Sequence, residues 1–142
     1  MPEPVIICLH QPVLELAEKV ASLCDGEVHG LQSRVKTIPK TFEKTKEHLQ
    51  DLFQKGHPLV GICSSGILIR SLADVLSDKH TEPPVLAVAE DGSCVIPLLG
   101  GHHGANDLAR KIASGLGVVA AVTAAGDLKF GIALDQPPED LT

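Results

Sequence analysis

Apolar and polar residues alternate in blocks along the chain, and the blocks predict strands and helices in turn. Short apolar runs, which are typical of buried strands, cover residues 5–10, 59–63, 85–89, 93–98 and 118–123, with a weaker run at residues 27–31. Apolar side chains recur at helical spacing over residues 11–24, 41–55, 67–76 and 105–116. Strands that alternate with helices favour a mainly parallel sheet covered by helices.

Turn-forming residues mark the boundaries of these elements. Pro12 stands near the start of the first helix, where its missing N–H costs nothing, Thr41 is placed to cap the second helix, and Gly56 closes it. Asp91-Gly92 lies between two apolar runs and predicts a β-hairpin. The fold class that follows is α/β: a three-layer, mainly parallel open sheet with helices on both faces and one hairpin.

The length of 142 residues suits a single domain. Residues 1–125 carry the alternating pattern and are predicted to form one α/β domain. Residues 126–142 lose the periodicity and contain the run DQPPED, so we interpret them as a linker or a truncated C-terminal tail. Aromatic residues make up only 2% of the chain, and the predicted core is therefore aliphatic.

Net charge narrows the range of partners. The chain carries a formal charge of −6, whereas nucleic-acid binding needs clustered Lys and Arg to neutralise phosphates. We therefore expect no nucleic-acid partner. No apolar run approaches the roughly 18 residues of a membrane span. The opening residues lack the basic region of a signal peptide. We expect a cytoplasmic protein with no membrane segment.

The four cysteines carry no metal or redox signature. Cys8, Cys24, Cys63 and Cys94 are far apart and form no C-x-x-C pair. Cys8 and Cys63 lie inside apolar runs, which is typical of buried, reduced thiols.

Two strand-to-helix turns are the candidates for chemistry. Ser64–Gly66 follows one apolar run, and the glycine-rich turn Gly100–Gly104 follows another. In open α/β sheets ligands bind near such turns, where the start of a helix offers free N–H groups to an anion. The alternative is that the glycines only shape the turns and the serines only cap a helix. The residues predicted to bind substrate are Ser64, Ser65, Gly66, Arg70, Gly100, Gly101, Gly104 and Asn106.

His102 and His103 are the candidate catalytic residues, because an imidazole titrates near neutrality and can act as a general base. The alternative is that they are turn or capping residues. Neighbouring helical residues diverge and no third ligand has suitable spacing, so we predict no metal site. Arg70 lies one helical turn beyond Gly66, where it would guard the same crevice or remain an ordinary surface charge.

The segment between about residues 49 and 127 resembles a known family. The matching stretches, in order and spacing, are GILIR (Gly66–Arg70), DKHTEPPV (Asp78–Val85), DGSCVIPLLGGHHGANDLA (Asp91–Ala109) and VTAAGD (Val122–Asp127). They are similar to the N-terminal region of the cobalt-precorrin-5A hydrolase (CbiG) family of cobalamin biosynthesis. The most specific part is Leu-Leu-Gly-Gly-His followed closely by Gly-Ala-Asn.

The resemblance implies a corrinoid substrate. Members of the family open the δ-lactone of cobalt-precorrin-5A and release a two-carbon fragment as acetaldehyde. Cobalt then enters only as part of the substrate, and no other cofactor is expected. The substrate carboxylates would be held by the helix starts at Gly66 and Gly104 with Arg70 nearby. Water would attack the lactone carbonyl with His102 or His103 as base and the N–H groups of the Gly100–Gly104 turn around the oxyanion.

Three functions remain open from the sequence. The first is an enzyme domain that binds a cobalt-precorrin and supports lactone opening. The second is a non-catalytic tetrapyrrole-binding or interaction domain, since similar domains are also fused to precorrin-3B C(17)-methyltransferase. Its partners would be a corrinoid, other cobalamin-pathway enzymes or a fused catalytic domain. The third is a nucleotide-binding regulatory domain, which the missing phosphate-binding fingerprints disfavour.

Overall fold

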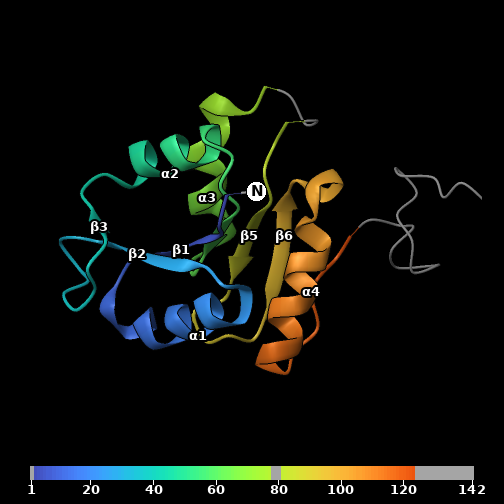
Figure 1. Cartoon of the computed structure of the whole chain (residues 1–142), viewed down its shortest axis with the longest axis horizontal. Coiled ribbons are helices and arrows are strands. Elements are labelled where there is room, and N and C mark those ends of the chain that lie inside the picture. Colours follow the sequence, from blue (N-terminus) through green and yellow to red (C-terminus); the bar gives the residue numbers. More distant parts are fainter. Residues whose placement is uncertain (1, 78–80, 124–142) are drawn as a thin grey trace, which may run out of the picture.

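A single sheet organises the molecule. The computed structural model describes residues 2–77 and 81–123, without the side chain of His102. Its six strands lie in the order β3-β2-β1-β4-β5-β6 (Figure 1). They are β1 (Val5–Cys8), β2 (Glu27–Leu31), β3 (Thr41–Phe42), β4 (Leu59–Gly61), β5 (Val85–Val88) and β6 (Val95–Leu99). The first five strands are parallel and β6 runs antiparallel to β5, which confirms the mainly parallel sheet with one hairpin.

Helices cover both faces of this sheet, as predicted. They are α1 (Leu14–Cys24), α2 (Thr45–Gln54), α3 (Ser65–Leu72) and α4 (Ala105–Leu116), with short 3-10 turns at Gln11–Val13, Ala73–Val75 and Gly101–His103. Buried side chains of α1 and α4 share one apolar cluster, and those of α2 and α3 share the other. Figure 1 shows the corresponding pairs of helices on the two sides of the strands. The three-layer α/β fold is therefore confirmed.

The central strand β1 explains why helices must pack on both faces of the sheet. All four of its residues are buried. Ile6 packs into the α1–α4 cluster, whereas Val5 and Ile7 pack into the α2–α3 cluster. Successive strand residues point to opposite faces, so a strand that is apolar throughout must be covered on both. Both clusters are almost entirely aliphatic, as the composition predicted.

Direction along the strands defines two edges of the sheet. The carboxyl edge is where the parallel strands β1–β5 end, and the amino edge is where they begin. From β1 the chain first builds outward through β2 and β3, and then returns to add β4, β5 and β6 on the other side of β1. The order reverses between β1 and β4, which makes this pair the topological switch point of the sheet.

The predicted helix over residues 41–55 is wrong at its start. Thr41 and Phe42 pair with Gly30 and Leu31 as the edge strand β3, and α2 begins only at Thr45. Phe42 is buried against α2 and its carbonyl accepts a hydrogen bond from the N–H of Gln32. Pairing with β2 therefore overrides the local helical spacing, and Thr41 is no helix cap.

The predicted last strand over residues 118–123 is also wrong in extent. Only Ala120 forms an isolated bridge, with Val95 of β6, supported by a 2.8 Å hydrogen bond from the N–H of Ala121 to the carbonyl of Val95. This segment runs beside the first residue of β6 without becoming a strand. The predicted tail at residues 126–142 lies outside the described residues.

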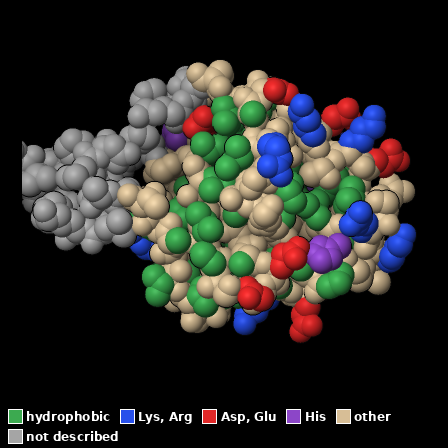
Figure 2. All heavy atoms as spheres, turned by 180° about the vertical axis from the view of Figure 1, so that it is seen from behind, with side chains coloured by type: hydrophobic (Ala, Val, Ile, Leu, Met, Phe, Trp, Pro, Cys, Tyr) green, Lys and Arg blue, Asp and Glu red, His purple; other side chains and the backbone are tan. Residues whose placement is uncertain are grey.

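The helix predicted over residues 67–76 is shorter than its pattern. After Leu72 the chain tightens into a 3-10 turn, and Leu76, the last residue of the predicted helix, is 37% exposed. Ile69 is 53% exposed, and the two side chains flank a groove of about 270 Å³ whose other walls come from β5 and β6. Seen from behind, hydrophobic side chains are spread over much of the molecule's face, with charged residues both among and around them (Figure 2).

Candidate functional site

Polar residues follow the three central strands at the switch point on the carboxyl edge. The register places one residue of each central strand in a common row: Ile7 of β1, Gly61 of β4 and Ala87 of β5. The third residue beyond this row is His10, Ser64 and Glu90 respectively. Ligands of open α/β sheets bind at this position. We call His10, Ser64, Ser65 and Glu90 the switch-point site.

His10 and Glu90 form a direct contact across this edge. Nε2 of His10 lies 2.7 Å from Oε2 of Glu90, so the pair reaches from the end of β1 to the end of β5. The side chains are 36% and 54% exposed, and such a pair contributes little to stability. The pair matters more for the proton-accepting chemistry of His10 than for stability. When the carboxylate accepts the proton of Nε2, the lone pair of the ring falls on Nδ1, which is the arrangement of an oriented general base.

The start of α3 supplies the anion-binding part of the site. Ser64 is the N-cap residue with extended backbone, yet no side-chain hydrogen bond caps the helix. The exposed hydroxyl of Ser64 and the half-buried Ser65 are thus not consumed as caps, which counts against their purely structural interpretation. The N–H groups of the first turn and the positive end of the helix dipole favour a negative ligand here.

Arg70 lies where the sequence predicted it, over the start of α3. A Cβ atom built on Gly66 would stand 3.1 Å from Nη1 of Arg70, so the guanidinium folds back one turn along the helix. Glycine leaves room for this approach. Ser64, Ser65, Gly66 and Arg70 are therefore brought together at one place on the carboxyl edge.

The second predicted turn lies at the opposite edge of the sheet. Because β6 is antiparallel, its last residue Leu99 pairs with Val85, the first residue of β5. Gly100 follows at the amino edge, where an added Cβ would lie 2.6 Å from the carbonyl oxygen of Pro83. The helix starts at Gly66 and Gly104, which were expected to hold the substrate carboxylates together, therefore lie at opposite edges of the sheet, and the hairpin is the physical reason. Binding of one substrate by both stays a prediction.

The Gly100–Gly104 turn is largely occupied by its own hydrogen bonds. The carbonyl of Gly100 accepts from the N–H groups of His103 at 2.8 Å and Ala105 at 3.1 Å, so these two donors are not free for an oxyanion. Gly100 itself is held at φ +80 against the Pro83–Pro84 backbone, which only glycine tolerates without strain.

Part of this turn remains a candidate for ligand binding. Nε2 of His103 is buried and finds no hydrogen-bond partner within the described part of the chain. Gly101 and Asn106 line a depression of about 180 Å³ together with Leu99 and Thr123. The structure does not describe the side chain of His102. Catalysis by His102 or His103 and substrate binding by Gly100, Gly101, Gly104 and Asn106 stay predictions.

The buried thiols play no visible part in this chemistry. Cys63, directly before Ser64, has its pKa raised to about 11, first by burial and then by the charge of Glu90. The thiol therefore stays protonated at neutral pH and is no nucleophile. All four cysteines are free, and Cys8 and Cys63 are buried, as the sequence predicted; Cys24 is buried as well.

Sequence reasoning missed His10 and Glu90. Each ends an apolar run, VIICLH and VLAVAE, so a polar residue directly after a buried strand was the available signal. It also missed a buried chain of contacts from Glu27 through His29 to His48. Over residues 2–77 and 81–123, no cluster of three or more metal-ligating side chains occurs. Within the same residues, no helix is long and apolar enough to cross a membrane.

Comparisons with known proteins identify the family of this domain. A family model described as "Cobalamin synthesis G N-terminal" matches residues 47–127. Cobalt-precorrin-5A hydrolase from Priestia megaterium is 38% identical over 61% of this chain, and the enzyme of the same name from Salmonella typhimurium is 42% identical over 54%. The chain spans only 24% and 22% of the lengths of these curated relatives.

A solved structure supports the fold over a longer stretch. The crystal structure of a cobalamin biosynthesis protein G homologue from Sulfolobus solfataricus superimposes on 85% of this chain and 36% of its own, with a TM-score of 0.64 and 19% identity. At that identity the likeness shows the fold alone. The family model, in contrast, covers more than half of the sequence, and the chain therefore belongs to the cobalamin synthesis G N-terminal family.

Proposed function

We propose that this domain binds a cobalt-precorrin during cobalamin biosynthesis and supports opening of the lactone of cobalt-precorrin-5A. The observation that carries the proposal is the family membership, together with two curated relatives named cobalt-precorrin-5A hydrolase. A corrinoid intermediate bears several acetate and propionate carboxylates, so its binding site needs anion-holding groups on the protein. Cobalt belongs to the substrate.

The switch-point site supports this proposal because it joins an anion-holding helix start to an oriented imidazole. A substrate carboxylate would accept hydrogen bonds from the N–H groups of the first turn of α3 and from Ser64, with Arg70 supplying charge. His10, held by Glu90, would be the general base.

The lactone step balances with these groups alone. His10 takes a proton from water as its oxygen adds to the lactone carbonyl carbon. The ring C–O bond then breaks, and the departing oxygen takes the proton back from His10, which leaves one carboxyl and one hydroxyl group. N–H groups at the start of α3 would stabilise the developing oxyanion.

His102 and His103 remain the alternative bases. They lie at the amino edge, so they cannot act on a group that is held at the start of α3 unless the substrate reaches across the sheet. The two assignments therefore predict different variants to be inactive.

The test is anaerobic incubation of this chain with cobalt-precorrin-5A, followed by absorbance and mass spectrometry. Lactone opening alone adds one water to the mass, and release of acetaldehyde then requires a carbon–carbon bond to break. We expect binding and either the gain of one water or the net change after acetaldehyde has also left, with His10→Gln slowing lactone opening by about a hundredfold. The matched control is His57→Gln, a histidine whose Nδ1 contacts the backbone carbonyl of Glu3, away from the switch-point site. Full activity of His10→Gln, with loss in His102→Ala or His103→Ala, would move the base to the amino edge.

A non-catalytic role is the second candidate. The chain spans less than a quarter of each curated relative, so the relatives hold most of their side chains outside the matched region. In this version the domain holds the tetrapyrrole and presents it to another module, such as a precorrin-3B C(17)-methyltransferase. Tight binding without any change in mass would favour this second function over the first.

A nucleotide-binding role is disfavoured by the turn after β1. The strand order is the one found in doubly wound dinucleotide-binding sheets. Those folds place a glycine-rich fingerprint directly after the first strand, where the pyrophosphate approaches the backbone. Here the turn reads Leu9-His10-Gln11-Pro12 and contains no glycine.

A further inference from the structure

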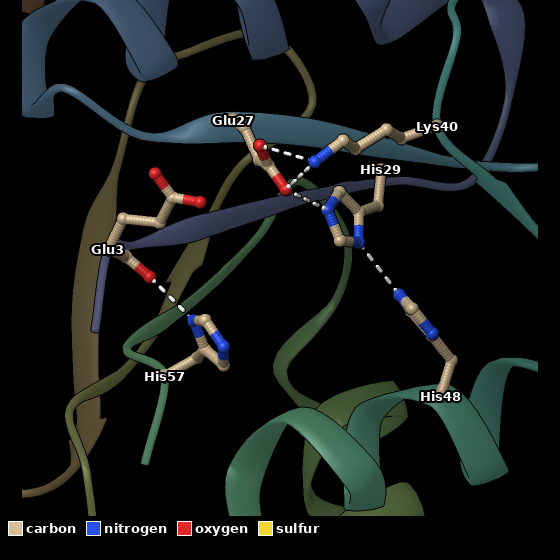
Figure 3. A network of polar contacts seen from close by, with 6 residues as sticks. All are labelled: Glu3, Glu27, His29, Lys40, His48 and His57. Carbon is tan, nitrogen blue, oxygen red and sulfur yellow. Dashed lines mark hydrogen bonds and ion pairs between the residues drawn. The ribbon is translucent and has the colours of Figure 1, made fainter. Parts of the chain in front are cut away.

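A chain of polar contacts among three residues ties the second strand to the second helix (Figure 3). Oε1 of Glu27 lies 2.7 Å from Nε2 of His29, and Nδ1 of His29 lies 2.8 Å from Nε2 of His48. Glu27 and His29 belong to β2, and His48 belongs to α2. The contact between the two rings is therefore a direct hydrogen bond between a strand and the helix that covers it.

The number of protons on the pair decides whether this hydrogen bond exists. The carboxylate of Glu27 fixes a proton on Nε2 of His29, and the two facing nitrogens share one more proton. Adding a proton to Nδ1 of His48 keeps the shared one in place. Once that position is filled, the next proton has only the shared nitrogens to bind. Two N–H groups would then point at each other, and the hydrogen bond is lost.

The surroundings make the pair sensitive to that proton. His29 is only 9% exposed, and the ring of His48 stacks on buried Phe42 with centroids 4.5 Å apart. Burial first, and then the charge of His29, lowers the pKa of His48. The hydrogen bond from His29, and then the one from Lys40, lowers the pKa of the Glu27 carboxyl.

Four charged groups face the two rings from the elements packed around them. Glu27 lies on β2, and Lys40, which precedes β3, binds both oxygens of Glu27 at 2.8 Å. Asp51 and Lys55 lie one and two turns beyond His48 on the α2 side, and they form an ion pair of 3.0 Å with each other. Their charges act on His48 in opposite directions, so they offset each other in part. Glu27 and the two rings therefore dominate the balance.

We propose that the His29–His48 pair is a proton-controlled latch that holds α2 on the sheet near neutral pH and releases it when the second proton binds. Release of α2 would affect the cavity at the start of α2 and the end of α3. The start of α2 and β3 line a cavity of about 650 Å³ with His48 in its wall. Gln50 of α2 also donates a 3.0 Å hydrogen bond to the carbonyl of Ser71, and Lys46 pairs with Asp74 at 2.8 Å. Release of α2 thus loosens the end of α3. The latch does not depend on the proposed function.

Amide hydrogen exchange of the wild-type chain tests the latch directly. Between about pH 7.5 and about pH 5, after correction for intrinsic exchange, we expect protection of α2 to fall by up to about tenfold for each pH unit below the ordinary histidine range. Protection of α1 and α4, on the other face, is expected to change much less. Equal losses in all four helices would overturn the latch.

Two substitutions separate the latch from general acid sensitivity. His48→Gln keeps an N–H donor for Nδ1 of His29 but cannot take up a proton, so we expect α2 protection to become independent of pH in this range. His57→Gln removes a half-buried histidine whose Nδ1 contacts the carbonyl of Glu3, outside the Glu27–His29–His48 chain, and it should behave as the wild type (Figure 3). A His48→Gln protein that loses protection as the wild type does would overturn the proposal.

A titration of the wild-type rings by nitrogen-15 NMR needs no variant to fold. We expect the pair to take up its protons in two separated steps, with the second step accompanied by shifts in the amides of α2. A single step near the ordinary histidine range for both rings would contradict the shared proton.

Discussion

Two histidine–carboxylate contacts of equal length have different surroundings. Nε2 of His10 and Nε2 of His29 each lie 2.7 Å from a glutamate oxygen. The His10 pair stands at the open carboxyl edge with side chains 36% and 54% exposed, whereas His29 is 9% exposed beneath α2. Distance alone therefore does not tell a reactive pair from a structural one. The two kinds of pair are told apart by the burial of the histidine and by the partner of its second ring nitrogen.

The second ring nitrogen makes the difference concrete. Nδ1 of His29 is used by His48, so this ring has no nitrogen left for a ligand. The ring of His10 contacts Glu90 through Nε2, and the thiol of Cys8 bonds the backbone carbonyl of His10 rather than its ring. We therefore expect changes at the buried pair to alter stability, and changes at the exposed pair to alter ligand chemistry.

The largest expected effect is at the buried pair. His29→Ala leaves Glu27 and His48 without their shared partner and opens space under α2, so it should lower the free energy of unfolding by about 2–3 kcal/mol. Urea denaturation at neutral pH measures this. His10→Ala is the matched control and should change stability by less than about 1 kcal/mol. Equal losses for the two variants would erase the distinction between the pairs.

Two glycines of the amino-edge turn test whether a glycine there is needed for packing or for contact with a ligand. Gly100→Ala places a methyl group 2.6 Å from the carbonyl of Pro83 at a φ of +80, and should cost about 1–3 kcal/mol. Gly101→Ala meets nothing within 4 Å and should be nearly neutral. Thermal unfolding compares the two variants. A neutral Gly100→Ala would remove the structural reason for this glycine and strengthen its interpretation as a ligand contact.

Acid should weaken the buried contact before it affects the carboxylates. The pKa of His48 is lowered in the folded state, so the folded form binds fewer protons than the unfolded one below the ordinary histidine range. The contribution of this contact to the free energy of unfolding is fully present above about pH 6.5. It decreases as pH falls, by at most about 1.4 kcal/mol per pH unit for one proton. Partial exposure of His48 reduces this limit. A melting temperature that stays constant down to about pH 5 would contradict it.

The smallest stability effects are expected at the switch-point site. Ser64→Ala removes a hydroxyl that caps no N–H of α3, and Glu90→Gln alters an exposed pair. Each variant should unfold within about 0.5 kcal/mol of the wild type. A larger loss for Ser64→Ala would mean that the serine supports the helix after all.

The sequence predicted the architecture because local signals agree with it. Central strands such as VIIC read as continuous apolar runs, and Asp91-Gly92 marked the hairpin. The start of α2 could not be read correctly, because Thr41 and Phe42 gain their strand structure from pairing with β2, a tertiary contact. The family match begins only at residue 47, so it gave no help with this strand.

The candidate site was predicted only in part, for a related reason. Ser64, Ser65, Gly66 and Arg70 lie within seven residues of one another, so helical spacing was enough to bring them together. Glu90 lies 80 residues from His10, and only the strand order makes them neighbours. The antiparallel direction of β6, which sends the Gly100–Gly104 turn to the other edge, follows from the predicted hairpin but changes which residues can share a ligand.

The most direct test of the account asks which edge of the sheet holds the corrinoid. We would titrate a stable corrinoid with free carboxylates into the wild type, Arg70→Ala and His103→Ala, with Arg34→Ala as a control for an exposed arginine elsewhere. The account predicts that Arg70→Ala weakens binding by about tenfold or more while His103→Ala and Arg34→Ala bind as the wild type. Loss of binding in His103→Ala with unchanged affinity in Arg70→Ala would contradict it and place the ligand at the amino edge.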